Sequence, residues 1–444
     1  MKIGVFGHYG NQNLGDEAIT TATIQNIQRH FPDAEIVGLS VKPDDTAERY
    51  GIDTYPIRNI KRSVPDSNEQ QSEQDLEQQK STPVSINSGA PSGLKHQLKR
   101  LPVVGQAISV IGRTLDLMRK WRQEFGFLAS SKRYLKDIDL IIVAGSNQFL
   151  DNFGGTWGFP YTLLKWSILC KLTNTRIAFT SIGAGPLEAP LSKFLVRVAL
   201  LFADYLSYRD VASKKLVENT IFPIDGKVYP DLAHSLSFVK EVANSPSDVA
   251  PSDKTIVAIN PMPIYDSRYW CEHDDGRYKA YVGKMSKFCE LLIEEGYQVQ
   301  FFSTQPTDEN VITDILDGID QHLLSDIDRS SVTQCNRQVD QLMTYLDSVD
   351  IVVATRLHGT ILSLLAEKPV FGVIYHRKSS DVLTDMEQGE YFVPLDNFDT
   401  KTLKSKFDIL AANVESEKKK IIQYGQEYRQ KLDKQYNEIF DLIR

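Results

Sequence analysis

The stretch IGVFGHYGNQNLGDEAI, residues 3–19, sets the fold class of this chain. Its first four residues form a short apolar run typical of a buried strand, and a glycine-rich polar loop follows at 7–17. Apolar residues then recur at helical spacing as far as Phe31, where Pro32 ends the pattern, and Asp16 is a candidate N-cap. A second strand is expected at 35–40. Strand, loop, helix and strand in this order predict a doubly wound α/β fold.

The same alternation continues along the chain. Strands are expected at 139–145, 176–181, 255–260, 298–303, 351–355 and 370–375, and helices at 159–172, 191–203, 278–295 and 337–348, near 359 and from 414 onward. A turn-rich linker at 242–254 divides the chain into an N-terminal Rossmann-like domain, a C-terminal one and a final helix. We expect these parts to span 1–241, 255–413 and 414–444. Two such domains face one another across a cleft, where ligands bind.

Composition excludes several classes of protein. The chain has 444 residues and a formal net charge of −8, whereas a protein that binds nucleic acid over its whole surface is usually basic. It contains no apolar run long enough to span a bilayer, and its N-terminal apolar run is too short for a signal peptide. The four cysteines are far apart, which gives poor support for a zinc site or a disulfide framework. We therefore expect a cytoplasmic enzyme without a metal or nucleic-acid partner.

Two consecutive segments depart from the α/β pattern. Residues 62–94 are rich in Gln, Ser, Glu and Pro and predict a flexible insertion. Residues 95–136 contain ten Lys or Arg and two acids, a balance of +8 that leaves −16 for the remainder. Apolar residues recur there every three or four positions from Leu98 to Leu128, although Pro102, Gly105 and Gly112 favour breaks. Such a basic amphipathic helix either packs on the domain or contacts an anionic membrane surface.

The segment DIVVATRLHGT, residues 350–360, is the strongest candidate site. A buried strand ends there and leads into a helix, whose N-terminal amides attract anions. Arg356 adds a cation with a planar donor fork, and His358 can exchange a proton near neutral pH. We expect an anion site with an acid–base group at this corner.

Two further sets of residues qualify as site candidates. The strand at 370–375 ends in Tyr375-His376-Arg377-Lys378, so Lys378 either extends the anion site or lies on a solvated edge. The first glycine-rich loop lacks the spacing of dinucleotide-binding and P-loop motifs. Its side chains Asn13, Asp16 and Glu17 either bind sugar hydroxyls or serve as cap and turn residues.

At this point the chain resembles the polysaccharide pyruvyl transferase family. The resemblance covers nearly the whole chain except residues 60–136 and the C-terminal tail. The opening loop and the Arg-Leu-His-Gly corner are specific in combination, and the blocks between them are individually weak. The matching blocks occur in order at 7–19, 139–148, 181–187, 207–210, 230–233, 355–359, 367–370 and 375–378.

The resemblance implies two domains arranged as in B-type glycosyltransferases. It implies transfer of the pyruvyl group of phosphoenolpyruvate to a sugar of a polysaccharide or its lipid-linked precursor, as a ketal, with release of phosphate. In this reading Arg356, Lys378 and Arg209 hold the donor, His358 is the general acid, and Asp16 orients or deprotonates the acceptor hydroxyl. Asn13, Glu17, Gly359 and Tyr375 complete the expected substrate-binding set, and no cofactor is needed.

One block departs from the family pattern. The chain has Ala144-Gly145-Ser146-Asn147-Gln148 where the family usually has a run of glycines. Larger side chains there alter the cleft. Two alternatives therefore stay open: a nucleotide-sugar glycosyltransferase of the same fold, and a non-catalytic member that binds glycans. A lipid-linked acceptor also agrees with a peripheral contact at the inner membrane through residues 95–136.

Overall fold

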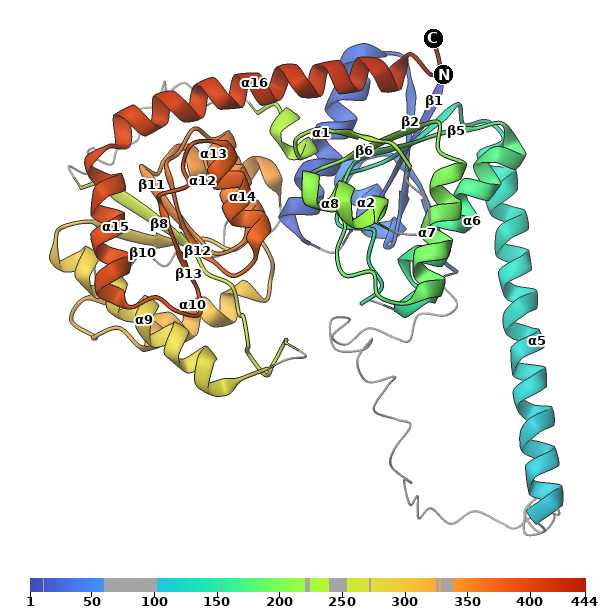
Figure 1. The fold of residues 1–444 in the computed structure, drawn as a ribbon, viewed down its shortest axis with the longest axis horizontal. Coiled ribbons are helices and arrows are strands. Elements are labelled where there is room, and N and C mark those ends of the chain that lie inside the picture. Colours follow the sequence, from blue (N-terminus) through green and yellow to red (C-terminus); the bar gives the residue numbers. More distant parts are fainter. Residues whose placement is uncertain are drawn as a thin grey trace.

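The structure is a computed structural model, and it describes residues 1–10, 12–59, 102–152, 154–219, 224–238, 254–270, 273–324, 327–328 and 338–444. Two parallel sheets, each covered by helices, form two Rossmann-like domains (Figure 1). The expected insertion at 62–94 lies outside the described residues, as does the expected linker at 242–254 apart from Lys254.

The N-terminal sheet has seven parallel strands with the order 3-2-1-4-5-6-7, which contains the strand order of a Rossmann fold. The central strand β1 (Lys2–Phe6) pairs on both sides, so that Ile3 lies opposite Ile36 and Leu140. A strand buried on both faces is expected to be apolar throughout. The other strands are β2 (Glu35–Ser40), β3 (Asp53–Pro56), β4 (Leu140–Val143), β5 (Arg176–Ile182), β6 (Tyr205–Tyr208) and β7 (Lys227–Val228).

The C-terminal sheet has six parallel strands with the order 10-9-8-11-12-13. Its central pair joins β8 (Ile256–Asn260) to β11 (Ile351–Ala354), and β11 also pairs with β12 (Val370–Ile374). The polar corner after β11 therefore adjoins the one after β12, as the sequence predicts for neighbouring strands. The remaining strands are β9 (Gln298–Phe301), β10 (Ile327–Asp328) and β13 (Phe392–Pro394).

Helices cover both faces of each sheet. In the N-terminal half they are α1 (Leu14–His30), α2 (Pro43–Tyr50), α5 (Pro102–Leu135), α6 (Phe159–Thr173), α7 (Pro190–Leu201) and α8 (Val211–Glu218), with short 3-10 turns η2 (Gly155–Trp157) and η3 (Leu232–Ser235). In the C-terminal half they are α9 (Asp275–Glu294), α10 (Asp308–Asp317), α12 (Val339–Asp347), α13 (Leu357–Leu365), α14 (Arg377–Asp385), α15 (Thr400–Ala412) and α16 (Val414–Phe440). No described helix is long and apolar enough to cross a bilayer.

Three details correct the expectations from sequence. The N-cap of α1 is Asn13, whose side chain accepts from the Gly15 amide, and Asp16 lies in the first turn. α13 begins at Leu357, before Gly359. α5 begins at Pro102 and continues through Gly105 and Gly112 without a break. Proline is favoured at the first helical position because its missing amide would have no partner there.

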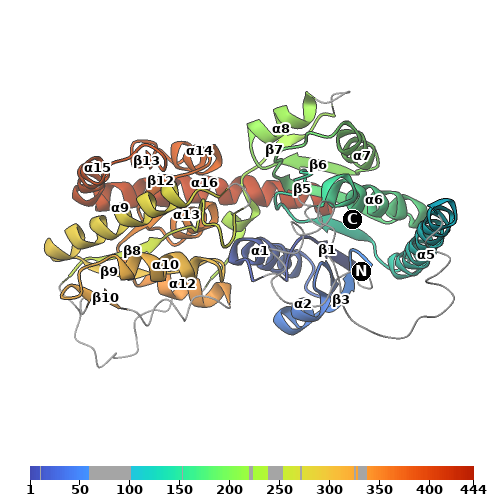
Figure 2. The ribbon, with the colours of Figure 1, turned by 90° about the horizontal axis from the view of Figure 1, so that it is seen from below.

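The last helix joins the two domains. The first part of α16 lies on the C-terminal domain, where buried Glu417 accepts from Gln388 at 2.6 Å. Its last part lies on the N-terminal sheet, where Glu438 accepts from Tyr205 and Tyr229. Figure 2 shows α16 running across both domains. The polar composition of this segment predicts a helix but gives no sign of this bridging position.

Candidate active site

His358 lies where the two domains meet, in the first turn of α13. Its ring packs so closely on the first turn of α1 that a Cβ atom on Gly15 would lie 1.9 Å from Nδ1. Only glycine leaves room for the ring at this position. Gly359 has a similar structural function, since a Cβ atom there would lie 2.1 Å from Oδ1 of Asn260 at the end of β8. Gly15 of the first loop block and Gly359 of the Arg-Leu-His-Gly corner thus both leave the space that the observed position of the His358 ring requires.

The other face of the imidazole is directed toward a buried ion pair. Nε2 of His358 lies 3.9 Å from Oδ2 of Asp231, which accepts a hydrogen bond from Nη1 of Arg209 at 3.0 Å. Asp231 also caps η3 by accepting from the Ala233 amide at 2.9 Å. Within the part of the chain that the structure describes, Nε2 of His358 is buried and has no hydrogen-bond partner. A buried polar atom in this state is costly unless a ligand satisfies it.

Lys378, at the start of α14 in the C-terminal domain, contacts the N-terminal domain next to the Arg209–Asp231 pair. Its ammonium group donates to Oδ1 of Asn147 and to the carbonyl of Ala184, both at 2.8 Å. An ammonium group has three N–H bonds, so these acceptors account for two of them. Among the described residues, no carboxylate forms an ion pair with Lys378. The charge therefore remains available to an anion.

A cavity between the domains connects these groups. The segments after β6 and β7, the helices α13 and α14, and α16 contribute to its wall, which carries two cations and four aspartates. His358 lies behind this wall, next to Asp231. The lining residues are Arg209, Asp210, Pro230, Asp231, His234, Leu357, Ile361, Lys378, Asp381, Val382, Asp385 and Tyr428. The strand ends of two doubly wound domains thus meet at a mixed-charge cavity, as expected for this fold.

Arg356 occupies the corner but faces a different partner. Its guanidinium is ion-paired with the fully buried Asp308, with Nε at 2.8 Å, and Nη2 donates to Thr307 at 3.3 Å. Asp308 in turn accepts from the amides of Thr304 and Gln305. The structure therefore places Arg356 against the loop after β9, and it does not line the cavity beside Arg209 and Lys378.

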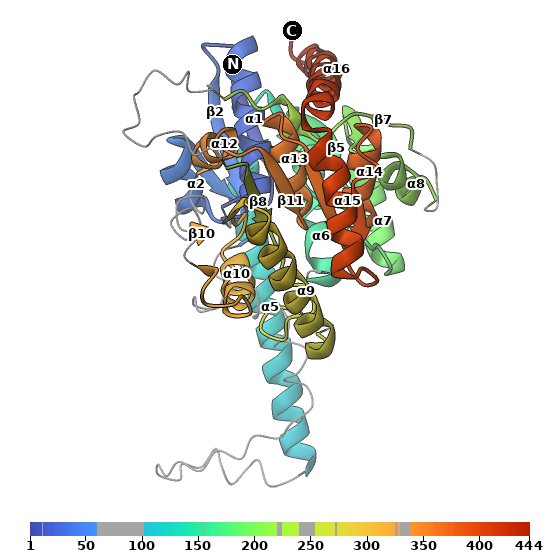
Figure 3. The ribbon, with the colours of Figure 1, turned by 90° about the vertical axis from the view of Figure 1, so that its left-hand side faces the viewer.

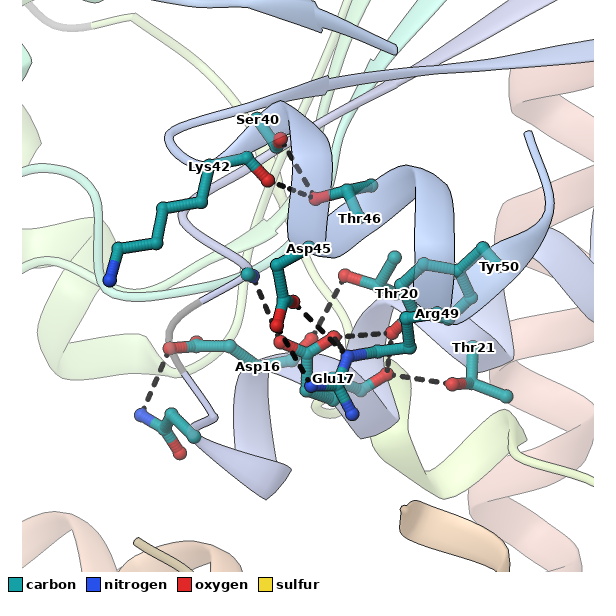
Figure 4. Close-up of polar contacts among 12 residues, drawn as sticks. Asp16, Glu17, Thr20, Thr21, Ser40, Lys42, Asp45, Thr46, Arg49 and Tyr50 are labelled. Carbon is teal, nitrogen blue, oxygen red and sulfur yellow. Dashed lines mark hydrogen bonds and ion pairs between the residues drawn. The ribbon is translucent and has the colours of Figure 1, made fainter. Parts of the chain in front are cut away.

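The first loop contributes one carboxyl group to the site. Asp16 accepts from Nδ2 of Asn13 at 3.0 Å and lies close enough to Arg209 and Asp231 for their charges to affect its pKa. Glu17 points elsewhere (Figure 4). It accepts from the Gly10 amide at 2.9 Å and from the hydroxyl of Tyr50 at 2.5 Å, which anchors the loop to α2. The sequence proposes Asn13 and Glu17 as sugar-binding residues. In the structure the Asn13 side chain caps α1, and the Glu17 carboxylate anchors the loop.

The electrostatics give the central groups unusual protonation states. Burial lowers the pKa of His358 to about 4, against the opposing effect of Asp231, with Arg209 and Arg356 lowering it further. Burial raises the pKa of Asp16 to about 8, Glu17 raises it too, and Arg209 opposes them. Burial and Arg209 lower the pKa of Lys378 to about 8. At neutral pH the site thus holds a neutral imidazole and a largely protonated carboxyl group.

The sequence did not single out several residues that the structure places here. From the sequence, Asp231 is included only within the block 230–233, and no function is proposed for it. None is proposed for Asp308 or His234 either. Asp231 does follow the strand β7 by three residues, and acids just after strands are the available signal. Tyr375, which the sequence proposes for substrate binding, is 40% exposed and packs edge-on against Trp270.

The altered glycine block has a structural explanation. A Cβ atom on Gly145 would lie 2.6 Å from the carbonyl oxygens of Thr180 and Ser181, so glycine is required there. Asn147 accepts from Lys378, and buried Gln148 donates to the Ala144 carbonyl at 3.0 Å. Of the larger side chains in this block, Asn147 therefore helps to position Lys378, and Gln148 forms hydrogen bonds within the block itself.

Comparisons with solved structures bear on the fold. The solved structure of UDP-GlcNAc 2-epimerase from Methanocaldococcus jannaschii is similar over 92% of each chain, with 10% identity and a TM-score of 0.52. The E. coli ADP-heptose lps heptosyltransferase II is similar over 84% of each chain, with 11% identity and a TM-score of 0.39. At such low identity the likeness to the epimerase shows the two-domain fold alone.

The sequence itself carries the family assignment. A comparison with curated proteins gives no match. The pattern described as "Polysaccharide pyruvyl transferase" matches residues 13–377, from the cap of the first helix to the start of α14. Because this match spans most of the sequence, the chain belongs to the polysaccharide pyruvyl transferase family.

Proposed function

We propose that the protein transfers the pyruvyl group of phosphoenolpyruvate to a sugar of a polysaccharide or its lipid-linked precursor. The observation that carries the proposal is the unsatisfied Nε2 atom of His358, which is buried beside Asp231. Asp231, its partner Arg209 and Lys378 line the interdomain cavity next to this atom. An anionic donor needs cations from both domains, and a proton carrier must stand next to it.

The proposed reaction balances without a cofactor. Two sugar hydroxyl oxygens bond to C2 of phosphoenolpyruvate, and the C2–O bond to the phosphate breaks. One hydroxyl proton ends on the methylene carbon, which becomes a methyl group, and the other leaves with phosphate. The protein therefore has to hold an anion, accept protons from hydroxyl groups and deliver one to carbon.

The protonation states suggest how this work is divided. A largely protonated Asp16 is suited to deliver a proton, and a neutral His358 is suited to accept one from an acceptor hydroxyl. This is the reverse of the assignment that the sequence suggests. Donor binding adds negative charge next to Asp16 and favours the protonated form that delivers the proton. Burial opposes the charged form of His358, so the imidazole stays able to accept the hydroxyl proton.

Arg356 supports the site through position. Its ion pair with Asp308 anchors the corner that carries His358, and its charge lowers the pKa of the imidazole. Replacement with alanine would leave Asp308 buried without its countercharge, which is expected to destabilise the fold. Arg356→Lys keeps a charge and is the appropriate variant for this residue.

Phosphate release tests the proposal. Phosphoenolpyruvate is incubated with the protein and a panel of model glycosides and lipid-linked glycans, and free phosphate and the ketal are measured. His358→Gln is expected to lower the rate by about 10²-fold or more. Lys378→Ala is expected to weaken donor binding in calorimetric titration, whereas Lys401→Ala, an exposed charge on α15, leaves it unchanged.

Three results would contradict the proposal. One is nucleotide release from a nucleotide sugar in place of phosphate release, which would assign a glycosyltransferase. The second is glycan binding by a protein that does not bind phosphoenolpyruvate. The third is a rate for folded His358→Gln within threefold of the parent, with folding checked by circular dichroism.

A further inference from the structure

Helix α5 is attached to the N-terminal domain along one face. The buried residues of its last part are Glu124, Phe127, Ser131 and Leu135, which follow helical spacing. Phe127 and Leu135 belong to the core that also contains Trp166 of α6. Glu124 accepts from Nζ of Lys165 and from the Tyr161 hydroxyl, both at 3.1 Å. This face is therefore a genuine packing surface.

Three residues of the apolar stripe expected from the sequence are exposed beside the packing face. Met118 is 62% exposed, Trp121 49% and Phe125 62%. The rings of Trp121 and Phe125 are 5.9 Å apart and lie on one side of the helix. Side chains of the stripe before Met118 lie outside the described residues. In the described part only Leu128, the last residue of the stripe, packs on the core of the domain, next to the face that carries Glu124. Met118, Trp121 and Phe125 take no part in this packing.

The charge around the stripe has one sign. Between residues 118 and 136 the sequence has six basic residues and a single acid, Glu124. Glu124 is buried against Lys165, whereas the basic residues, Arg119, Lys120, Arg122, Lys132, Arg133 and Lys136, are all exposed. Exposed aromatic side chains beside exposed Lys and Arg are characteristic of segments that lie in the headgroup region of anionic bilayers.

The position of α5 favours the same partner. The helix projects away from the body of the protein (Figures 1 and 3). It projects in the direction in which the strands of the N-terminal sheet run, toward the edge that carries Asn147 and Arg209 (Figure 1). Further exposed apolar side chains, Ile168, Leu172, Phe194 and Leu201, lie on α6, which packs on α5, and on α7, which packs on α6.

We propose that the exposed stripe of α5, here Met118, Trp121 and Phe125, docks on the surface of an anionic bilayer. Its apolar side chains enter the headgroup boundary while Lys120 and Arg122 contact lipid phosphates. A second copy of the chain is a poorer partner for this stripe, because pairing two α5 helices would bring like charges together. The docking does not depend on the reaction, but it would hold the cavity close to an acceptor carried on lipid.

Vesicle flotation with the full chain tests the proposal. The vesicles contain phosphatidylcholine alone, or phosphatidylcholine and phosphatidylglycerol in equal amounts. The parent should float with the anionic vesicles only. Trp121→Ser/Phe125→Ser and Lys120→Gln/Arg122→Gln should each lower the partition coefficient by about tenfold or more. The matched control Val211→Ser/Ile409→Ser changes two exposed apolar residues on α8 and α15 and should float like the parent.

Several results would overturn the inference. They are a parent that fails to float with anionic vesicles, both α5 variants floating as well as the parent, or a concentration-dependent dimer of the parent that Trp121→Ser/Phe125→Ser dissociates. Thermal unfolding of each variant confirms that the fold is intact. Phosphate release with a soluble acceptor should be unchanged in the α5 variants, so failure of docking and failure of the proposed reaction give different results.

Discussion

At the scale of single residues, the site depends on how closely Gly15 and His358 approach each other. The glycine belongs to the first turn of α1 and the histidine to the first turn of α13, and their sequence positions are more than three hundred residues apart. The contact leaves Nδ1 against the α1 backbone and Nε2 toward Asp231. The orientation of the imidazole therefore depends on Gly15, a residue without a functional side chain.

Gly15→Ala is expected to abolish transfer while the protein stays folded. The new methyl group would lie 1.9 Å from Nδ1, so the ring must turn away from Asp231. The measurement is phosphate release together with circular dichroism. Gly283→Ala in α9 is the control, because a Cβ atom there meets nothing within 4 Å and alanine favours helix by about 1 kcal/mol. Activity of Gly15→Ala near that of the control would show that the ring orientation is unimportant.

At the scale of elements, α16 holds the two domains together through polar contacts. Its buried Gln435 accepts from Oγ of Ser181 at 3.1 Å and donates to Oγ of Ser207 at 2.7 Å. Ser181 has a φ of +46°, a left-handed conformation that costs energy for a residue other than glycine. The glutamine thus braces a strained position at the end of β5, one strand away from the Lys378 contact.

Gln435→Leu should lower the free energy of unfolding by about 1–3 kcal/mol. Two buried hydroxyl groups lose a partner, and leucine offers no replacement. Urea unfolding of the parent and the variant gives the difference. Gln423→Leu on the same helix is the control, since its side chain is exposed and its bond to Glu427 lies within the helix. Equal loss in both variants would refute the bracing function.

At the scale of the whole molecule, the burial of ionisable side chains makes the free energy of unfolding depend on pH. Burial lowers the pKa of His8, of His234 and of His358 to about 4 in each case. Between pH 6.5 and pH 4 the unfolded chain therefore binds more protons at these histidines than the folded one, and they destabilise the fold as the pH falls. Asp16 acts in the opposite sense, because its raised pKa keeps a proton on the folded protein up to about pH 8.

His234→Asn isolates one of these contributions. At pH 7 the variant should be less stable than the parent, since it loses the edge-on contact with Tyr428. At pH 5 the unfolded parent binds a proton at His234 that the folded parent does not bind, and this lowers the stability of the parent. The variant has no such group. The difference in unfolding free energy between parent and variant should therefore be smaller at pH 5 than at pH 7, by about 1–2 kcal/mol. Urea unfolding at both pH values measures this. The exposed His322→Asn is the control, and a deficit that stays constant would contradict the assignment.

Local pattern in the sequence determined the central strands of both sheets, most of the long helices and the two corners that carry Arg356, His358 and Lys378. These features depend on the order of apolar and polar residues within a short stretch of chain. That order is visible in the sequence as a helical period or as the end of an apolar run. The adjacency of β11 and β12 is likewise implied by alternating strands and helices. The family resemblance rests on the same local blocks.

Tertiary structure alone decided which partner each functional group has. Arg356 meets Asp308, His358 meets Gly15 and Asp231, and Lys378 meets Asn147. The same holds for α5: its period shows one apolar stripe, and only the position of α6 decides that the face with Glu124 is buried. The physical reason is that charge, burial and pKa depend on groups that folding brings together from distant positions, and a one-dimensional pattern records only near neighbours.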